Sequence, residues 1–297
     1  MKLKTMTKPA GEAAAAPATV KEARTAKPPA KAVPEAPSTK KRLVKGKSDM
    51  PIMPASGALT LESILGLDER TRIVETEDAP WRMICALEID GPFGAFIGTG
   101  WFAGPRTVVT AGHCVFDRSQ MGGWANSIKL MPGRDGMEKP FGTVTSTRFS
   151  TTDVWLNDQN ADFDIAAIHL DTPVGEERGW FQIASLEDDV LQGFMVNVSG
   201  YPGDRGGGTE QWWARNRVRA VTQRRIFYDV DTFGGQSGGP AFIIEQEGAP
   251  PVVVGIHAYG TGGTPASIPF TVNSAPRIIP EVVEKVQEWI DQDNQGG

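Results

Sequence analysis

The sequence contains little of what builds a metal centre, a disulfide scaffold or a membrane span. Its 297 residues include two cysteines and three histidines, and because these are scattered we expect neither a metal ion nor any other cofactor. No apolar stretch is long enough to cross a membrane. Lys2 and Lys4 are not followed by the apolar run that a secretory signal peptide needs. These shortages exclude a disulfide-rich mini-protein and a membrane-spanning chain.

Aromatic residues are absent from residues 1–47, which are rich in alanine, proline and lysine. This stretch holds twelve Lys or Arg and three Glu, a net charge of about +9 in a chain whose net charge is −6. Such a segment cannot bury a core, so we expect a disordered basic extension over residues 1–62. Two interpretations stay open: a tail that contacts the phosphates of nucleic acid or membrane, and a pro-segment attracted to the acidic body.

Long helical periodicity is also rare. Strand-like runs at residues 83–89, 96–102, 252–257 and 270–272 are short and separated by Gly, Pro and Asp turns, as in antiparallel all-β domains. At about 280–292 a proline opens a run with apolar residues at positions 282, 283, 286, 289 and 290, which predicts a helix. The sequence therefore predicts an all-β domain over residues 63–297 that ends in one helix.

The run Gly-Gly-Gln-Ser-Gly-Gly-Pro at residues 234–240 has the composition of a nucleophile loop. Glycines on both sides of Ser237 let the backbone turn sharply and leave room for a substrate carbonyl. The amides of Gly235 and Ser237 could then stabilise a developing oxyanion. A serine hydroxyl is a poor nucleophile by itself, so this interpretation requires a base and a group that orients it.

The base is expected at His113, in the run Thr-Ala-Gly-His-Cys at residues 110–114. The orienting carboxylate is expected between this histidine and the serine. Asp164 fits best because a short apolar strand follows it directly and would bury it beside the imidazole, fixing the tautomer. Asp162 is the fallback. His169 is expected on the exposed face of that strand, without a chemical role.

With these motifs in the order His, Asp, Ser, the chain resembles the chymotrypsin-fold serine peptidases and, more narrowly, the bacterial glutamyl endopeptidases. The narrower resemblance rests on residues 68–72 (DERTR), 100–105 (GWFAGP), 199–204 (SGYPGD) and 228–233 (YDVDTF), and it extends over roughly residues 63–292. It implies two six-stranded antiparallel β-barrels, at about 75–175 and 176–278. The active site would lie between the barrels, and the C-terminal helix would pack on the second.

The resemblance implies a serine endopeptidase that acts on polypeptide substrates through His113, Asp164 and Ser237. It also implies an exported monomer, with no nucleic acid partner. Export conflicts with the lack of a recognisable signal peptide. Three explanations stay open: a misassigned start, an unconventional export route, and action inside the cell. A catalytically silent protease-like binding module is the alternative of a different class. It has less support because the triad residues and the oxyanion glycines are all present.

Two interpretations of the specificity pocket compete. In glutamyl endopeptidases a histidine on the strand after the nucleophile and a threonine five residues before it bind the substrate carboxylate, and His257 and Thr232 match these positions. Both side chains can donate hydrogen bonds to a carboxylate. The alternative is Asp231, at the offset where trypsin-type enzymes place the carboxylate that binds Lys or Arg. We expect cleavage after Glu, or after Asp.

The resemblance also suggests how the chain matures. Mature glutamyl endopeptidases begin close to the segment that matches Ser63, where the new α-amine helps to bind the substrate carboxylate, and the preceding residue is Glu62. We therefore predict a zymogen that is cut after Glu62. The trypsin route pairs the new amine with an aspartate just before the nucleophile, and this chain has Gln236 there.

Two cysteines allow either one bridge or two reduced thiols. With a hairpin turn at residues 90–94, Cys85 lies opposite about Thr99, close to where related enzymes carry the cysteine that bridges to the one beside their catalytic histidine. Cys114 is that neighbour. We expect a disulfide between Cys85 and Cys114, and with it an oxidising compartment.

Overall fold

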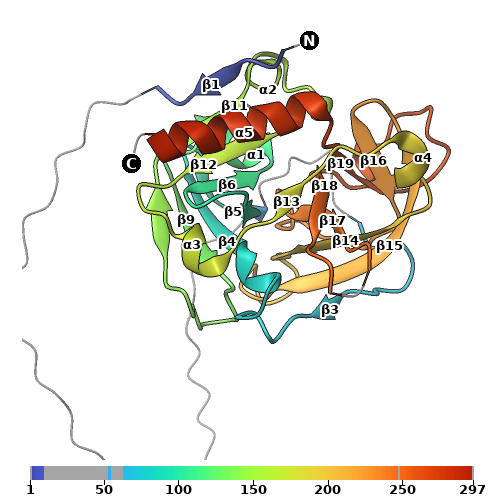
Figure 1. Cartoon of the computed structure of the whole chain (residues 1–297), viewed down its shortest axis with the longest axis horizontal. Coiled ribbons are helices and arrows are strands. Elements are labelled where there is room, and N and C mark those ends of the chain that lie inside the picture. Colours follow the sequence, from blue (N-terminus) through green and yellow to red (C-terminus); the bar gives the residue numbers. More distant parts are fainter. Residues whose placement is uncertain (1, 10–52, 55–62, 247, 296–297) are drawn as a thin grey trace, which may run out of the picture. The chain divides into compact units, whose positions relative to one another are not determined.

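The computed structural model describes residues 2–9, 53–54, 63–246 and 248–295, and most of its strands belong to two curled, largely antiparallel sheets (Figure 1). The predicted extension at residues 1–62 therefore lies mostly outside the described residues. In the described part, no helix is long and apolar enough to cross a membrane.

The first barrel is built from the order β11-β12-β6-β5-β4-β9-β10. Only Thr147 separates β10 from β11, so these two segments act as one bent strand that joins both ends of the sheet and gives six strands in all. The bounds are β4 (Ile84–Gly91), β5 (Gly94–Phe102), β6 (Thr107–Thr110), β9 (Ser127–Pro132), β10 (Val144–Ser146), β11 (Arg148–Thr152) and β12 (Ala166–His169).

The second barrel has the order β18-β17-β14-β15-β16-β19. A bridge between Gly255 and Arg277 brings the β18 end of this sheet to the β19 end. The bounds are β14 (Met195–Gly200), β15 (Trp212–Val221), β16 (Arg225–Tyr228), β17 (Pro240–Ile243), β18 (Val252–Ile256) and β19 (Asn273–Pro276). The predicted pair of six-stranded antiparallel barrels is therefore confirmed.

Shorter elements complete the described chain. At the sheet edges lie β2 (Met53–Pro54), β3 (Thr71–Arg72) and β13 (Gln182–Ile183), and a separate ribbon joins β7 (Phe116–Asp117) to β8 (Gly123–Trp124). The short helices are α1 (Gly112–Val115), α2 (Asp153–Asp158), α3 (Gly175–Arg178) and α4 (Asp188–Leu191). Single 3-10 turns are η1 (Trp81–Met83), η2 (Ala161–Phe163) and η3 (Thr261–Gly263).

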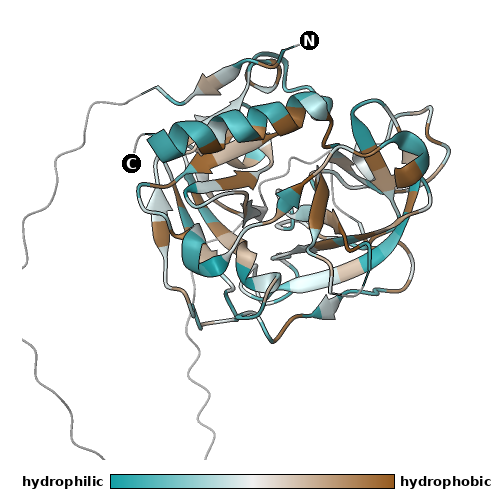
Figure 2. Ribbon diagram, viewed as in Figure 1, coloured by the Kyte–Doolittle hydropathy of each residue, from teal (hydrophilic) through white to brown (hydrophobic). Residues whose placement is uncertain are grey.

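The C-terminal helix α5 (Pro280–Gln295) confirms the predicted amphipathic helix but not its place. It lies across β6 and β12 of the first barrel rather than on the second barrel (Figure 1). Its hydrophobic residues face the sheets (Figure 2), and Val282, Val286 and Trp289 are buried in the same core as the first barrel. A Cβ at Gly104 would lie only 3.2 Å from the Ile290 side chain, a tight contact that the glycine avoids where the helix approaches the barrel.

His169 does not lie on an exposed face as predicted. Its side chain is buried, with Nδ1 2.9 Å from the carboxylate of Asp293 on α5 and Nε2 2.8 Å from the hydroxyl of Ser150. The alternation of β12 gave the wrong side because both faces of this strand are covered, one by the barrel interior and the other by α5. A histidine between two layers needs polar partners on both ring nitrogens, and it has them.

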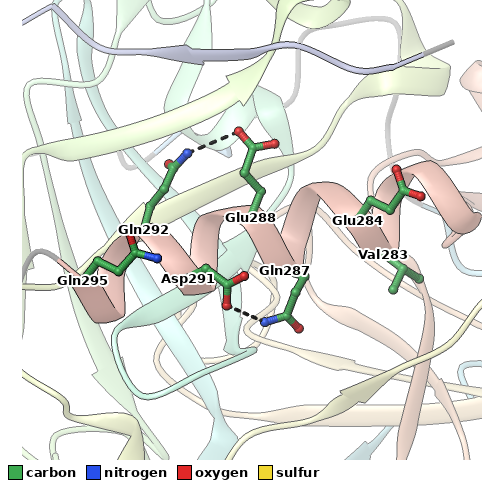
Figure 3. Close-up of a pocket in the computed structure, with 7 residues that line it drawn as sticks. All are labelled: Val283, Glu284, Gln287, Glu288, Asp291, Gln292 and Gln295. Atoms are coloured by element: carbon green, nitrogen blue, oxygen red, sulfur yellow. Dashed lines mark hydrogen bonds between the residues drawn. The ribbon is translucent and has the colours of Figure 1, made fainter.

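The outer face of α5 is polar (Figure 3). Gln287 donates a hydrogen bond to Asp291 at 2.8 Å, and Gln292 donates one to Glu288 at 3.2 Å. These pairs are four residues apart, where side chains on a helix surface meet. A shallow hollow along this face is lined by Val283, Glu284, Gln287, Glu288, Asp291, Gln292 and Gln295.

The start of the chain is not disordered as predicted. Strand β1 (Thr5–Thr7) pairs antiparallel with β11 and covers its open edge. Leu3 is buried in the first core, and the hydroxyl of Thr5 accepts hydrogen bonds from Lys285 and Trp289 of α5. Composition failed here because one leucine and one strand edge suffice to hold a short segment.

Candidate active site

His113 lies in the single turn α1, directly after β6. The carboxylate of Asp164 contacts it twice: Oδ1 accepts from the backbone N–H of His113 at 2.8 Å, and Oδ2 lies 2.7 Å from Nδ1. A side chain at Gly112 would meet the Trp155 ring at 2.7 Å and Asp164 Oδ1 at 2.8 Å. The glycine before the histidine is therefore what lets the carboxylate reach the backbone.

Asp164 follows η2 and is fully buried. Asp162, the fallback, is half-buried within that 3-10 turn, where its backbone N–H bonds the side chain of Asn160 at 3.0 Å. The structure thus brings Asp164, and not Asp162, to the imidazole.

The electrostatics at His113 favour its protonated form. Burial alone would lower the pKa of His113, but the charge of Asp164 and its hydrogen bond outweigh burial and raise that pKa well above its ordinary value. In the part of the chain that the structure describes, the second ring nitrogen, Nε2, is buried without a hydrogen-bond partner. This is the nitrogen that a base would turn toward a nucleophile.

The loop of Ser237 is shaped by glycines with positive φ. Gly235 has φ 106° and Gly238 has φ 87°, and a side chain at Gly238 would meet the Thr99 carbonyl at 2.1 Å. Backbone bonds fix the loop: Thr99 N–H donates to the Ser237 carbonyl at 2.8 Å, and Gly238 N–H donates to the His257 carbonyl at 2.6 Å. Only glycine fits these positions without strain.

The serine loop and the histidine turn lie against each other. The thiol of Cys114, the residue after His113, is 3.6 Å from the carbonyl oxygen of Ser237. The structure therefore brings the Ser237 loop to the turn that carries His113.

The predicted pocket residues Thr232 and His257 are both fully buried. Ser63 lies beside Thr232, since its carbonyl accepts from the Thr232 N–H at 3.3 Å. Tyr228, which the sequence did not single out, places its hydroxyl 2.6 Å from Nδ1 of His257. Tyr228 therefore orients the ring of His257 through its Nδ1.

The carboxylate of Asp231 is occupied by backbone groups of this chain. Its carboxylate accepts hydrogen bonds from the backbone N–H of Leu65 at 2.6 Å and of Glu69 at 2.8 Å, and the residue is 2% exposed. The sequence could not reveal these partners, because they lie more than 160 positions away along the chain.

Tyr259 is a second residue that the sequence did not single out. Its ring centroid lies 6.3 Å from that of His113, and burial together with the nearby charge of Asp164 raises the pKa of its hydroxyl well above the ordinary value. Its place in the sequence, two residues after His257, is the signal that could have found it.

The predicted disulfide between Cys85 and Cys114 is wrong: in the described structure both cysteines are buried and free. The hairpin turn is one residue tighter than expected, so Cys85 pairs with Gly100 rather than Thr99. The position facing the Cys114 thiol is Gly98, whose missing side chain would lie 3.0 Å from that sulfur. A bridge to Cys114 would need a cysteine there.

Known proteins of similar sequence and structure can now be compared. A family model described as Trypsin matches residues 71–278. A glutamyl endopeptidase of Bacillus licheniformis is 36% identical over 242 residues, which are 80% of this chain and 72% of the relative. An extracellular metalloprotease of Bacillus subtilis is 33% identical over 232 residues, 77% of this chain and 70% of the relative.

Solved structures give the same family. The structure of a Glu endopeptidase in complex with MPD matches with a TM-score of 0.66 and 26% identity, over 77% of this chain and all of that one. Among the described residues, no group of three His, Cys, Asp or Glu side chains is placed to hold a metal ion. With the family model covering both barrels, the chain belongs to the trypsin family of chymotrypsin-fold serine peptidases, in its glutamyl endopeptidase group.

Proposed function

We propose that this chain is a serine endopeptidase that cleaves peptide bonds after glutamate, with His113, Asp164 and Ser237 as its catalytic triad. The double contact of Asp164 with His113, at 2.8 Å to the backbone and 2.7 Å to the ring, carries the proposal. A buried carboxylate in this position holds the imidazole in one tautomer and stabilises the imidazolium that forms during catalysis.

In the proposed reaction, Nε2 of His113 takes the proton of the Ser237 hydroxyl while Oγ attacks the substrate carbonyl. The oxyanion accepts hydrogen bonds from the amides of Gly235 and Ser237. His113 then gives its proton to the leaving amine. Water then attacks the acyl-enzyme with His113 again as the base, and this step releases the carboxylic acid product and free Ser237.

Cleavage after glutamate is supported by the pocket. The side chains of Thr232 and His257 are hydrogen-bond donors, and Tyr228 holds the histidine ring at 2.6 Å. Asp231 would have to give up two amide bonds to bind a Lys or Arg side chain, and leaving those buried amides unpaired is costly. The observed partners of Asp231 therefore favour Glu over Lys or Arg.

A further part of the proposal is that residues 1–62 are a pro-segment whose peptide bond to the peptidase domain is cut after Glu62, which lies outside the described residues. We also propose that the enzyme acts as an exported monomer. The name of the Bacillus subtilis relative, an extracellular protease, supports export.

The test is to incubate the full-length protein with a mixed-peptide library and to read the cleavage sites by mass spectrometry, with Ser237→Ala as the control. Cuts after Glu that are absent from the control support the proposal. Cuts after Lys or Arg would mean that Asp231, and not His257, binds the substrate side chain. Any cut that the Ser237→Ala control also makes would come from a contaminant.

A further inference from the structure

Arg225, the first residue of β16, is a buried cation without a carboxylate partner. It is 3% exposed, its Nη1 donates to the Gly263 carbonyl at 2.8 Å, and its Nη2 donates to the Ser274 hydroxyl. Among the described residues no carboxylate lies within ion-pair distance of Arg225, and its Nε has no hydrogen-bond partner. A buried charge is costly unless an opposite charge offsets it, so this arginine requires negative charge nearby.

Tyr259 connects this arginine to the proposed triad. The guanidinium carbon of Arg225 lies over the Tyr259 ring, 4.9 Å from its centroid, and the centroid of the His113 ring is 6.3 Å from the same point. Burial lowers the pKa of Arg225, and the charges of Asp162 and Asp164 oppose that lowering. The charge of Asp164 also acts on the Tyr259 hydroxyl. The negative charge that Arg225 requires is therefore supplied in part by the carboxylate that orients His113.

Backbone contacts hold Arg225 and Tyr259 together. The N–H of Tyr259 donates to the Ser274 carbonyl at 3.1 Å, and the N–H of Ser274 donates to the Tyr259 carbonyl at 2.8 Å. A Cβ at Gly263 would lie 2.9 Å from that of Tyr259, so the glycine permits η3 to pack closely on the tyrosine. Since Arg225 bonds both Ser274 and Gly263, the same two residues hold the guanidinium and the ring beneath it.

The other charged and titratable groups near His113 belong to the elements around α1 and to the turn before Asp164. The carboxylate of Asp117 is occupied by the backbone N–H groups of Ser119 and Gln120, at 2.8 and 2.7 Å. The other two cations, Arg118 and Arg224, are exposed and half-buried. Besides Asp164, Tyr259 and Arg225, the groups are Cys114 of α1, Asp117 and Arg118 at β7, Asp153 and Asp158 of α2, Asp162 of η2 and Arg224 before β16. Within this described set, Arg225 is the buried cation.

We propose that Arg225 and Tyr259 are positioning residues that keep His113 a neutral base, because the guanidinium and the tyrosine hydroxyl offset the negative charge of Asp164. This inference rests on the proposed function, since it acts on the proposed triad. Protonation of His113 adds a positive charge, which Asp164 favours and Arg225 opposes. Without Arg225, the buried carboxylate would hold a proton on the imidazole to higher pH. The arginine therefore extends the pH range in which His113 can accept the serine proton.

The test is the pH profile of kcat/KM on a Glu peptide, measured from pH 5 to 10 for the wild type, Arg225→Gln and Arg225→Lys. Glutamine keeps a donor for the Gly263 carbonyl but carries no charge. We expect its acid limb to move up by about one pH unit, the effect of a unit charge about 10 Å away at an effective dielectric constant of about 20. Above that limb, kcat/KM should stay within about threefold of the wild type. Lysine keeps the charge and should keep the wild-type midpoint.

Two further variants separate this role from a structural one. Tyr259→Phe keeps the ring, removes the hydroxyl and should raise the midpoint by less than Arg225→Gln does; it decides the test if Arg225→Gln does not fold. Arg277→Gln removes another buried arginine of the second barrel, one that is paired with Asp188, and should lower stability without moving the midpoint. Wild-type midpoints in both Arg225→Gln and Tyr259→Phe, or an equal shift in Arg277→Gln, would overturn the inference alone. A wild type whose cleavage after Glu does not require Ser237 would overturn the proposed function.

Discussion

His169 and Asp293, 124 positions apart, bond each other at 2.9 Å in a buried layer between the first barrel and α5. Thr107 donates to the same carboxylate at 2.6 Å, and Ser150 lies 2.8 Å from the other ring nitrogen. This hydrogen-bond network of serine, histidine and aspartate looks like a second triad. Ser150 is fully buried, however, so the network holds the helix in place and does not meet substrate.

Asp293→Ala should therefore destabilise the fold without changing catalysis. Removing the carboxylate leaves His169 and Thr107 without their buried partner, which costs about 2–3 kcal/mol of unfolding free energy. Urea unfolding measures this loss. Asp291→Ala, on the exposed face of the same helix, should change stability by less than about 0.5 kcal/mol. Equal stability of the two variants would contradict the buried role of Asp293.

Asp164→Asn should lower kcat by about 10⁴-fold, because an amide cannot hold the imidazole in the productive tautomer. Steady-state kinetics on a Glu peptide checks this. The matched control is Asp162→Asn, two residues earlier, which should stay near wild type. A large loss of kcat in Asp162→Asn with a small loss in Asp164→Asn would mean that Asp162 orients the histidine.

Activity should have an acid limb set by His113. The base must be neutral to accept the serine proton, and its pKa is raised above the ordinary value, so kcat/KM should fall with decreasing pH through a midpoint above about 6.5. Protonation of the substrate glutamate near pH 4.3 then acts only on an enzyme already losing its base. A pH profile of kcat/KM that stays flat from pH 8 to 5 would refute this order.

His257→Ala should reduce kcat/KM for a Glu peptide by roughly 100-fold, the upper range for a hydrogen bond to a charged group. The matched Gln peptide should lose much less, since it offers no charge to the pocket. Comparing the two peptides on each enzyme gives the measurement. Equal losses on both would mean that His257 supports the fold of the pocket and not its charge selectivity.

Reducing agent should not change the melting temperature, because Cys85 and Cys114 are free and buried. Burial also raises the pKa of the Cys85 thiol, so it should resist alkylation in the folded protein. Mass spectrometry after alkylation should find no modified thiols when folded and two when unfolded. A single mass lacking two hydrogens would indicate a bridge.

Features encoded within a short run were accessible from the sequence. The turns around His113 and Ser237 depend on adjacent small residues: a side chain would strike a neighbour at each of Gly112, Gly235, Gly238 and Gly239. The strands and α5 likewise follow from local periodicity. The conformation of such a run is set by its own residues and does not depend on which distant segment packs against it.

Features that depend on pairing between distant segments were not accessible. The β4–β5 register pairs Cys85 with Gly100, whereas the Cys114 thiol faces Gly98. The offset of Asp231 left a Lys- or Arg-binding carboxylate open as the alternative, and its bonds to the distant Leu65 and Glu69 argue against that role. In both cases the pairing of distant segments decides which residue lies next to the side chain, and with it the role of that side chain.

Strand β1 has a consequence for the processed molecule. Because residues 5–7 pair with β11 and Thr5 contacts α5, the first residues of the chain are held by the body and not only by the peptide bond at Ser63. A cut after Glu62 would therefore yield two polypeptides that travel together. Native mass spectrometry would weigh them as one particle, whereas a denaturing gel would separate them.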